Sequence, residues 1–277
     1  MDYTELVFTL TTDDDFTQDL LIQDLSDLGF ESFEDIAQGF RAYVNREVFQ
    51  EESLKELLTG YAAFKITYLV HEIETINWNL EWEKNYPPVT IADQVYVRAS
   101  FHDHRPEFAL EIHIEPKMAF GTGHHDTTCL VAEYVLELDM QDKNVLDMGC
   151  GSGILAILAE KRGAASLLAV DIDEVCTSST RENAQLNNCR NISVQTGDIG
   201  SLGSQQFDVI LANINRNILL VHLERYASLL LPGGILVMSG FYEDPDLEII
   251  SARARELGFT AAGHRERNKW AAAKFYR

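Results

Sequence analysis

The chain has 277 residues, 46% of them hydrophobic and 24% charged, which is enough for one large domain or two smaller ones. No stretch reaches the roughly 20 apolar residues of a membrane span, and the first residues lack the basic region of a signal peptide. We therefore expect a cytoplasmic protein without membrane contact. The formal net charge of -22 argues against direct binding of nucleic acid and is compatible with a basic protein partner.

The negative charge is concentrated in the first 74 residues, which hold eight Asp and nine Glu against two Arg and two Lys. Two interpretations stay open. The acidic residues keep the chain soluble, or they dock a basic protein, and charge alone slightly favours solubility.

Four cysteines are scattered along the chain without a C-x-x-C pair, which predicts no bound metal. We expect each of them to be a small buried hydrophobic residue in a reducing compartment. They are Cys129, Cys150, Cys176 and Cys189.

Residues 1–74 predict a small α+β domain. Its expected elements, in chain order a strand, a helix, two strands, a helix and a strand, cover residues 3–10, 16–28, 30–33, 40–44, 51–58 and 63–70. Gly29 favours the end of the first helix. The order of elements is that of the ferredoxin-like split unit.

Residues 75–86 predict a helical linker. Trp78 and Trp82 lie one helical turn apart, and two Trp on one face favour burial. We expect them to serve as a hinge or in packing between domains rather than in substrate contact. Pro87 and Pro88 end the helix.

Residues 87–277 predict a second, larger domain. Two strand-like runs open it, and from Asp126 short apolar strands alternate regularly with helices. Such alternation predicts a doubly wound, mostly parallel sheet with helices on both faces, the Rossmann-like α/β class. The predicted strands cover 89–100, 108–115, 144–147, 167–171, 192–195, 207–212, 234–239, 259–266 and 270–276, and the helices cover 127–138, 153–162, 174–187, 217–230 and 245–257.

The strongest motif is VLDMGCGSGI over residues 145–154, in which a strand ends at Asp147 and a glycine-rich turn opens a helix. Ile154 stands where the dinucleotide pattern G-x-G-x-x-G requires Gly or Ala. The turn, with Gly149 and Gly151, instead resembles motif I of class I methyltransferases. This resemblance implies S-adenosylmethionine as the cofactor. Asp147 can orient the positively charged end of the cofactor, and free N–H groups of the turn suit the cofactor's carboxylate.

Two later strand ends carry acids suited to the nucleoside part of that cofactor. Asp171 lies 22 residues after Gly149, near the spacing of a ribose-binding carboxylate. Asp198 follows the next strand, which borders the adenine pocket in the methyltransferase fold. It can accept a hydrogen bond from the exocyclic amine, and an ordinary turn residue is an equally good interpretation.

Asn213, in the sequence ANIN over 212–215, ends a further strand, where open α/β sheets bind ligands. Many methyltransferases that act on nitrogen carry N-P-P-Y here, and its backbone and Asn carbonyls hold the substrate amine. This chain lacks the prolines and the aromatic residue, which disfavours enzymes acting on adenine or glutamine. We expect Asn213 to position the substrate amine.

The segment EPKMAFGTGHHDTT over residues 115–128 resembles the bacterial PrmA family, methyltransferases of large-subunit ribosomal protein 11. That family has a very similar M-A-F-G-T-G-x-H-x-T-T segment. It also shares the turn D-x-G-C-G-S-G-I-L-A-I, here at 147–157, and A-N-I, here at 212–214. Its architecture is a ferredoxin-like recognition domain, a helical linker and a class I catalytic domain. The resemblance thus covers essentially the whole chain, with motif-level identity confined to 115–214.

The resemblance implies S-adenosylmethionine-dependent methylation, typically to the trimethyl state, of lysine side chains and the N-terminal amine of that basic ribosomal protein. The family's cofactor contacts carry over to Thr128, Gly149, Asp171 and Asn213. Two departures stand out. Lys117 occupies a position where the family often has Gly. INRNI, residues 214–218, follows Asn213 where I-L-A-G-P is common in the family, at the predicted substrate mouth.

The predicted mechanism is in-line attack of a neutral amine on the activated methyl group, so that the protein's main task is orientation. His124 and His125 are candidates for a general base, and a gating or packing role is preferred for both. Two alternatives stay open. One is a class I methyltransferase acting on another protein or a small amine, and the other is a non-catalytic cofactor-binding scaffold, which the intact motifs disfavour.

Overall fold

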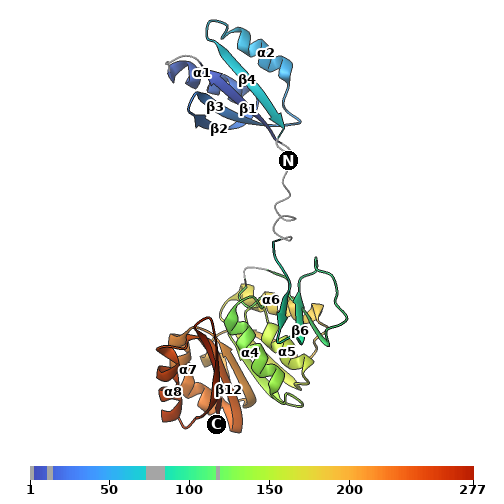
Figure 1. Ribbon diagram of the computed structural model, residues 1–277, viewed down its shortest axis with the longest axis vertical. Helices are drawn as coiled ribbons and strands as arrows, with labels where there is room; N and C mark the ends of the chain where they lie inside the picture. Colours follow the sequence, from blue (N-terminus) through green and yellow to red (C-terminus); the bar gives the residue numbers. More distant parts are fainter. Residues whose placement is uncertain (1–2, 11–14, 73–84, 117–118) are drawn as a thin grey trace. The chain divides into compact units, whose positions relative to one another are not determined.

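The computed structural model describes residues 3–10, 15–72, 85–116 and 119–277. Contacts divide the chain into two compact units, Met1–Asn85 and Tyr86–Arg277 (Figure 1). The predicted linker helix, with Trp78 and Trp82, lies outside the described residues as far as residue 84. Within the described ranges no helix is long and apolar enough to cross a membrane.

The first unit has the predicted order of elements. These are β1 (Tyr3–Leu10), α1 (Asp15–Asp27), β2 (Phe30–Ile36), β3 (Gly39–Asn45), α2 (Glu51–Thr59) and β4 (Ile66–Glu72). The strands form an antiparallel sheet in the order β2-β3-β1-β4. Every second residue of β1 is buried, so that Leu6 and Phe8 meet Leu21 and Leu25 of α1 and Leu54 of α2 in one core. The α+β prediction is confirmed.

The second unit is built around a seven-stranded sheet in the order β10-β9-β8-β11-β12-β14-β13. The first five strands of this order are parallel, and β14 and β13 close the sheet antiparallel. The strands are β8 (Asn144–Met148), β9 (Ser166–Asp171), β10 (Ile192–Thr196), β11 (Phe207–Asn213), β12 (Leu230–Tyr242), β13 (Thr260–Arg267) and β14 (Trp270–Tyr276). The strand order reverses direction between β8 and β11, the place where such sheets bind ligands.

Helices cover both faces of this sheet (Figure 1). They are α4 (Asp126–Glu137), α5 (Ile154–Lys161), α6 (Glu174–Leu186), α7 (Arg216–Leu229) and α8 (Asp246–Glu256), with a short 3-10 turn, η1 (Ile199–Ser201). One core joins α4 and α5 to the sheet, and α6 packs beside α5, on β9 and β10. A second core joins α7 and α8 to the opposite face. The doubly wound α/β prediction is confirmed. Of the four cysteines, Cys129 and Cys150 are buried as expected, whereas Cys176 and Cys189 are partly buried.

A separate three-stranded sheet precedes the parallel one. The single strand predicted over 89–100 is wrong, because the chain folds there into a hairpin of β5 (Val89–Ile91) and β6 (Val95–Arg98). Ala92 and Asp93 both have positive φ, 50° and 54°, as a tight hairpin turn requires. The sequence lacks the Asn-Gly signal of such a turn. β7 (Leu110–His113) pairs parallel with β6 and leads into the segment at 115–125.

Candidate active site

The glycine-rich turn between β8 and α5 lies at the reversal point of the sheet. Gly149 and Gly151 have φ of 80° and 53°, a region that favours glycine. A Cβ on Gly151 would lie 2.3 Å from the carbonyl oxygen of Phe120, and one on Gly149 would lie 2.1 Å from Ile214 Cγ2. Glycine is therefore needed here both for the turn itself and for the close approach of its neighbours.

The N–H groups of this turn all have acceptors within the protein, and their contact with the cofactor carboxylate stays a prediction. Those of Gly149 and Cys150 donate to the carbonyl oxygen of Val170, at 2.8 and 3.0 Å. The next three N–H groups donate to the Asp171 carboxylate, the Phe120 carbonyl and the Cys150 carbonyl. The physical reason is that a turn this closely packed satisfies its own donors, as buried backbone groups must.

Asp147 lies beneath the turn rather than beside it. Its side chain is 1% exposed, and Oδ2 accepts a hydrogen bond from Ala156 N–H at 3.2 Å. Its other oxygen, Oδ1, is buried without a hydrogen-bond partner among the described residues. Burial raises the pKa of Asp147 to about 7, against the opposing effect of the Ala156 hydrogen bond.

Asp147→Asn is expected to become progressively more stable than the wild type as pH rises. The unfolded carboxyl ionises near pH 4, but the folded one stays protonated until about pH 7, so the wild type loses stability across that window. The difference should grow by about 3 kcal/mol between pH 5 and pH 8. Urea denaturation of both proteins at the two pH values measures it, and parallel stability curves would contradict the buried-acid assignment.

Asp171 ends β9, and Asp198 lies two residues after the end of the neighbouring strand β10, whose Thr196 pairs with Asp171. Each oxygen of the Asp171 carboxylate accepts one backbone hydrogen bond at 3.0 Å, from Gly151 and from Asp173. These two bonds fix the carboxylate at the mouth of the turn. Asp198 is exposed and accepts a hydrogen bond from Ser201 N–H at 3.1 Å. It therefore caps η1, as the interpretation of Asp198 as a turn residue expects.

Asn213 and Thr128 are brought together from positions 85 residues apart. Asn213 Nδ2 donates to Thr128 Oγ1 at 3.3 Å, which joins the end of β11 to the first turn of α4. Thr128 is 1% exposed. The Oδ1 atom of Asn213 is buried and has no partner in the described part of the chain. Asn213 thus presents a free acceptor at the carboxyl edge of the sheet.

The segment at 119–125 lies directly on the glycine-rich turn. Ser152 N–H donates to the carbonyl oxygen of Phe120 at 2.8 Å, and Ser152 Oγ donates to that of Gly121. His124 Nδ1 lies 3.1 Å from Thr122 Oγ1, and its Nε2 lies 2.9 Å from the carbonyl oxygen of Pro87. Both ring nitrogens of His124 are therefore engaged, which supports a role in anchoring this segment rather than as a base. Lys117 lies outside the described residues.

An aromatic wall that was not predicted from the sequence lies next to this segment, made by His125, Tyr242 and Trp270. The rings of Tyr242 and Trp270 stack at 4.2 Å, and His125 meets Trp270 edge-on at 4.9 Å. A cavity of about 310 Å³ lies at the carboxyl ends of β11 and β12, lined by Asn215, Arg216, Tyr242, Asp246 and Trp270 among others. A Trp at the start of the last strand carries no sequence signal for such a place, because only the pairing of β14 with β12 brings it there.

These residues fit S-adenosylmethionine. Of three buried side-chain atoms that lack a hydrogen-bond partner in the described residues, two, Asp147 Oδ1 and Asn213 Oδ1, belong to this edge of the sheet. Both are acceptors, and the cofactor brings an ammonium and a sulfonium. Asp171 supplies a carboxylate for hydroxyl donors. The described residues contain no group of His, Cys, Asp and Glu arranged to hold a metal ion.

Comparison with known proteins agrees with this site. The sequence model of the family described as "Ribosomal protein L11 methyltransferase (PrmA)" matches residues 16–277. A protein of that name from Phocaeicola vulgatus is 44% identical and covers 99% of both chains. One from Porphyromonas gingivalis is 47% identical and covers 93% of this chain and 90% of its own.

Solved structures support the fold. The crystal structure of a ribosomal protein L11 methylase from Lactobacillus delbrueckii subsp. bulgaricus has a TM-score of 0.65 at 30% identity, covering 69% of this chain and 99% of that one. A methyltransferase from Pyrococcus furiosus, at 20% identity and a TM-score of 0.51, shares the fold over 60% of this chain and 88% of its own. This chain belongs to the PrmA family and is a class I, S-adenosylmethionine-dependent protein methyltransferase.

Proposed function

We propose that this chain methylates lysine side-chain amines and the N-terminal amine of ribosomal protein L11. The observation that carries the proposal is the buried Oδ1 of Asn213, which has no hydrogen-bond partner in the described residues and lies at the edge of the sheet where the cofactor residues gather. The names of the relatives from Phocaeicola vulgatus and Porphyromonas gingivalis supply the protein substrate. A cytoplasmic location follows from such a substrate.

We assign cofactor contacts to Thr128, Asp147, Gly149, Gly151, Asp171, Asp198 and Asn213. S-adenosylmethionine supplies a methyl group activated by a sulfonium. Asp171 is held by two backbone donors in a position to accept from ribose hydroxyls. Asp147 Oδ1 offers an acceptor to the ammonium, and pairing with a cation would favour its ionised form.

Orientation of the substrate amine is the catalytic task of Asn213. Its Oδ1 accepts an N–H of the amine, while its Nδ2 is tied to Thr128 and keeps the amide from rotating. Fixing an amine in line with an activated methyl group accounts for a large share of the rate of such a reaction. The aromatic faces of Tyr242 and Trp270 suit the alkyl stem of lysine and a methylated ammonium.

The amine has to lose a proton before it attacks, because lysine in water has a pKa of roughly 10.4. Removal of the amine from water in the cavity at Tyr242 and Trp270 disfavours its charged form. Arg216 lines the same cavity, although its guanidinium is paired with Asp246 at 2.6 Å. We assign no side chain as the base, since His124 has both ring nitrogens engaged.

We propose that the first unit recognises and binds the protein substrate. It has a core of its own, and its surface is strongly acidic, whereas the proposed substrate is a basic protein. Its exposed acids include Asp19, Asp27, Glu31, Glu34, Asp35, Glu47, Glu51, Glu52 and Glu56.

Removing residues 1–85 is expected to leave the affinity for S-adenosylhomocysteine within about twofold of the full chain and to abolish methylation of L11. The cofactor residues all belong to the second unit, whereas the acidic surface belongs to the first. Calorimetric titration and a radioactive methyl-transfer assay measure the two properties on the same preparation. Undiminished methylation of L11 by residues 86–277 would contradict the role of the first unit in recognising L11.

A further inference from the structure

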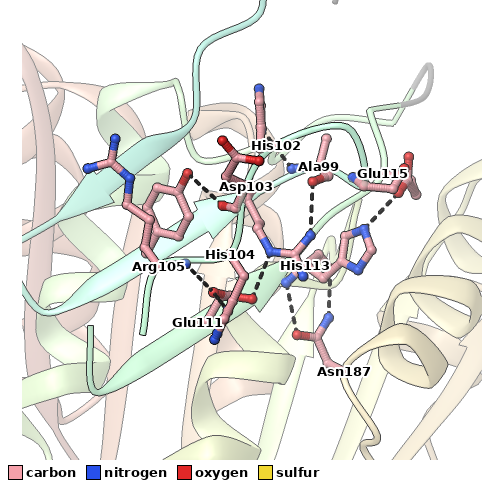
Figure 2. A network of polar contacts seen from close by, with 12 residues as sticks. Ala99, His102, Asp103, His104, Arg105, Glu111, His113, Glu115 and Asn187 are labelled. Carbon is pink, nitrogen blue, oxygen red and sulfur yellow. Dashed lines mark hydrogen bonds and ion pairs between the residues drawn. The ribbon is translucent and has the colours of Figure 1, made fainter. Parts of the chain in front are cut away.

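Helix α6 holds the outer edge of β7 with side-chain amides. β7 is the last strand of its three-stranded sheet, and β6 occupies one of its edges. On the other edge, Asn187 Oδ1 accepts from His113 N–H at 2.9 Å, and Asn187 Nδ2 donates to the His113 carbonyl at 2.6 Å. Figure 2 shows this amide facing the backbone of His113 as a neighbouring strand would.

Asn183 lies one helical turn earlier and accepts a hydrogen bond from the next N–H group along the same edge of β7. Its Oδ1 accepts from Glu115 N–H at 3.0 Å. His113 and Glu115 are two residues apart, so their N–H groups point the same way, while Ile114 N–H points to β6 and donates to Arg98. The two asparagines therefore extend the pairing of β7 up to the base of the segment at 119–125.

Asn183 differs from Asn187 in what its NH2 group binds. Asn183 Nδ2 donates to the carbonyl oxygen of Ser152 in the glycine-rich turn, at 2.9 Å, whereas Asn187 Nδ2 binds His113 and Asn183. Ser152 in turn binds the carbonyl oxygens of Phe120 and Gly121 through its N–H and its hydroxyl. The Asn183 side chain is 1% exposed. Its amide thus connects Glu115, at the stem of the segment at 119–125, to the glycine-rich turn that this segment covers.

We propose that Asn183 is a positioning residue for methyl transfer: its buried amide sets the spacing between the segment at 119–125 and the glycine-rich turn at 149–153. This inference rests on the proposed cofactor site. An amide suits the place because it offers an acceptor to one backbone and a donor to the other. A shift of about 1 Å between the two segments is enough to lower the rate of an orientation-dependent reaction about 100-fold.

The test compares Asn183→Ala with Asn187→Ala as a matched control. Both remove a buried amide from the edge of β7, Asn183 within α6 and Asn187 at its C-cap, but only the first breaks the bond to the turn. Hydrogen exchange in the ligand-free protein should rise at 119–125 and 149–153 in Asn183→Ala, and near 110–115 alone in Asn187→Ala. Affinity for S-adenosylhomocysteine should fall about tenfold in the first variant and within about twofold in the second.

Equal exchange and equal affinity changes in the two variants would overturn the proposal and leave Asn183 a merely structural residue. If the alanine variant does not fold, Asn183→Asp keeps the volume and the acceptor for Glu115 N–H but, when ionised, cannot donate to Ser152. It should raise exchange at 149–153 and not at the stem, and unchanged exchange at the turn would contradict the proposal. Neither readout needs L11, so both remain valid if the protein substrate is a different one.

Discussion

Asn213→Ala is expected to lower kcat for L11 methylation about 100-fold while weakening S-adenosylhomocysteine binding less than about fivefold. The side chain presents a buried acceptor, Oδ1, with no partner in the described residues, and its Nδ2 is tied to Thr128. Removing it leaves the amine without the group that orients it, whereas Asp147 and Asp171 still hold the cofactor. Steady-state kinetics with L11 and calorimetry with S-adenosylhomocysteine separate the two effects.

Asn144→Ala is the matched control for this variant. Asn144 begins β8, the strand next to β11, and therefore lies at the opposite edge of the sheet from Asn213. Loss of this amide should leave both kcat and cofactor affinity unchanged within about twofold. Equal losses of turnover and cofactor affinity in Asn213→Ala would contradict the role of Asn213 in positioning the amine. Asn213 would then be a cofactor contact only.

Gly151→Ala is expected to lower cofactor affinity more than tenfold and to destabilise the fold by more than the roughly 1–2 kcal/mol of left-handed backbone strain alone. The added Cβ would lie 2.3 Å from the carbonyl oxygen of Phe120, a backbone atom that can move only with the whole covering segment. The turn and the segment at 119–125 would then separate. Urea denaturation and titration with S-adenosylhomocysteine measure the two losses.

Gly233→Ala isolates the backbone strain from the collision. Gly233 has φ of 79°, and a Cβ there would meet nothing within 4 Å. This control should lose stability by the strain alone and should bind the cofactor as the wild type does. If the two alanine variants lose equal stability and keep equal affinity, the close contact between Phe120 and Gly151 has no part in cofactor binding.

Much of the second unit could be predicted because helix and strand periods differ and its turns carry glycine or acidic caps. β8, β9 and β14 fall within a residue of their expected bounds, and Asp173 caps α6 as its position after a strand suggests. The hairpin at Ala92 and Asp93 was missed because Ala is not a usual choice for positive φ and no Gly accompanies the Asp.

The candidate site was predictable only where a residue follows a strand. Asp171 and Asn213 lie at the carboxyl ends of parallel strands, and that rule places them at one edge. Trp270 and Asn183 were beyond reach, because the pairing of β14 with β12 and the face that α6 turns to β7 are set by tertiary packing. The same limit explains the N–H groups of the glycine-rich turn, whose acceptors come from Phe120 and Val170 in other elements.

The central claim is tested most directly by incubating the purified full-length protein with tritiated S-adenosylmethionine and ribosomal proteins from cells that lack this gene. We expect label in a single protein, identified as L11, and none in the RNA fraction. Label in a different protein would contradict the proposed substrate while preserving the enzyme class. Absence of label from every fraction, with S-adenosylhomocysteine binding intact, would contradict catalysis itself.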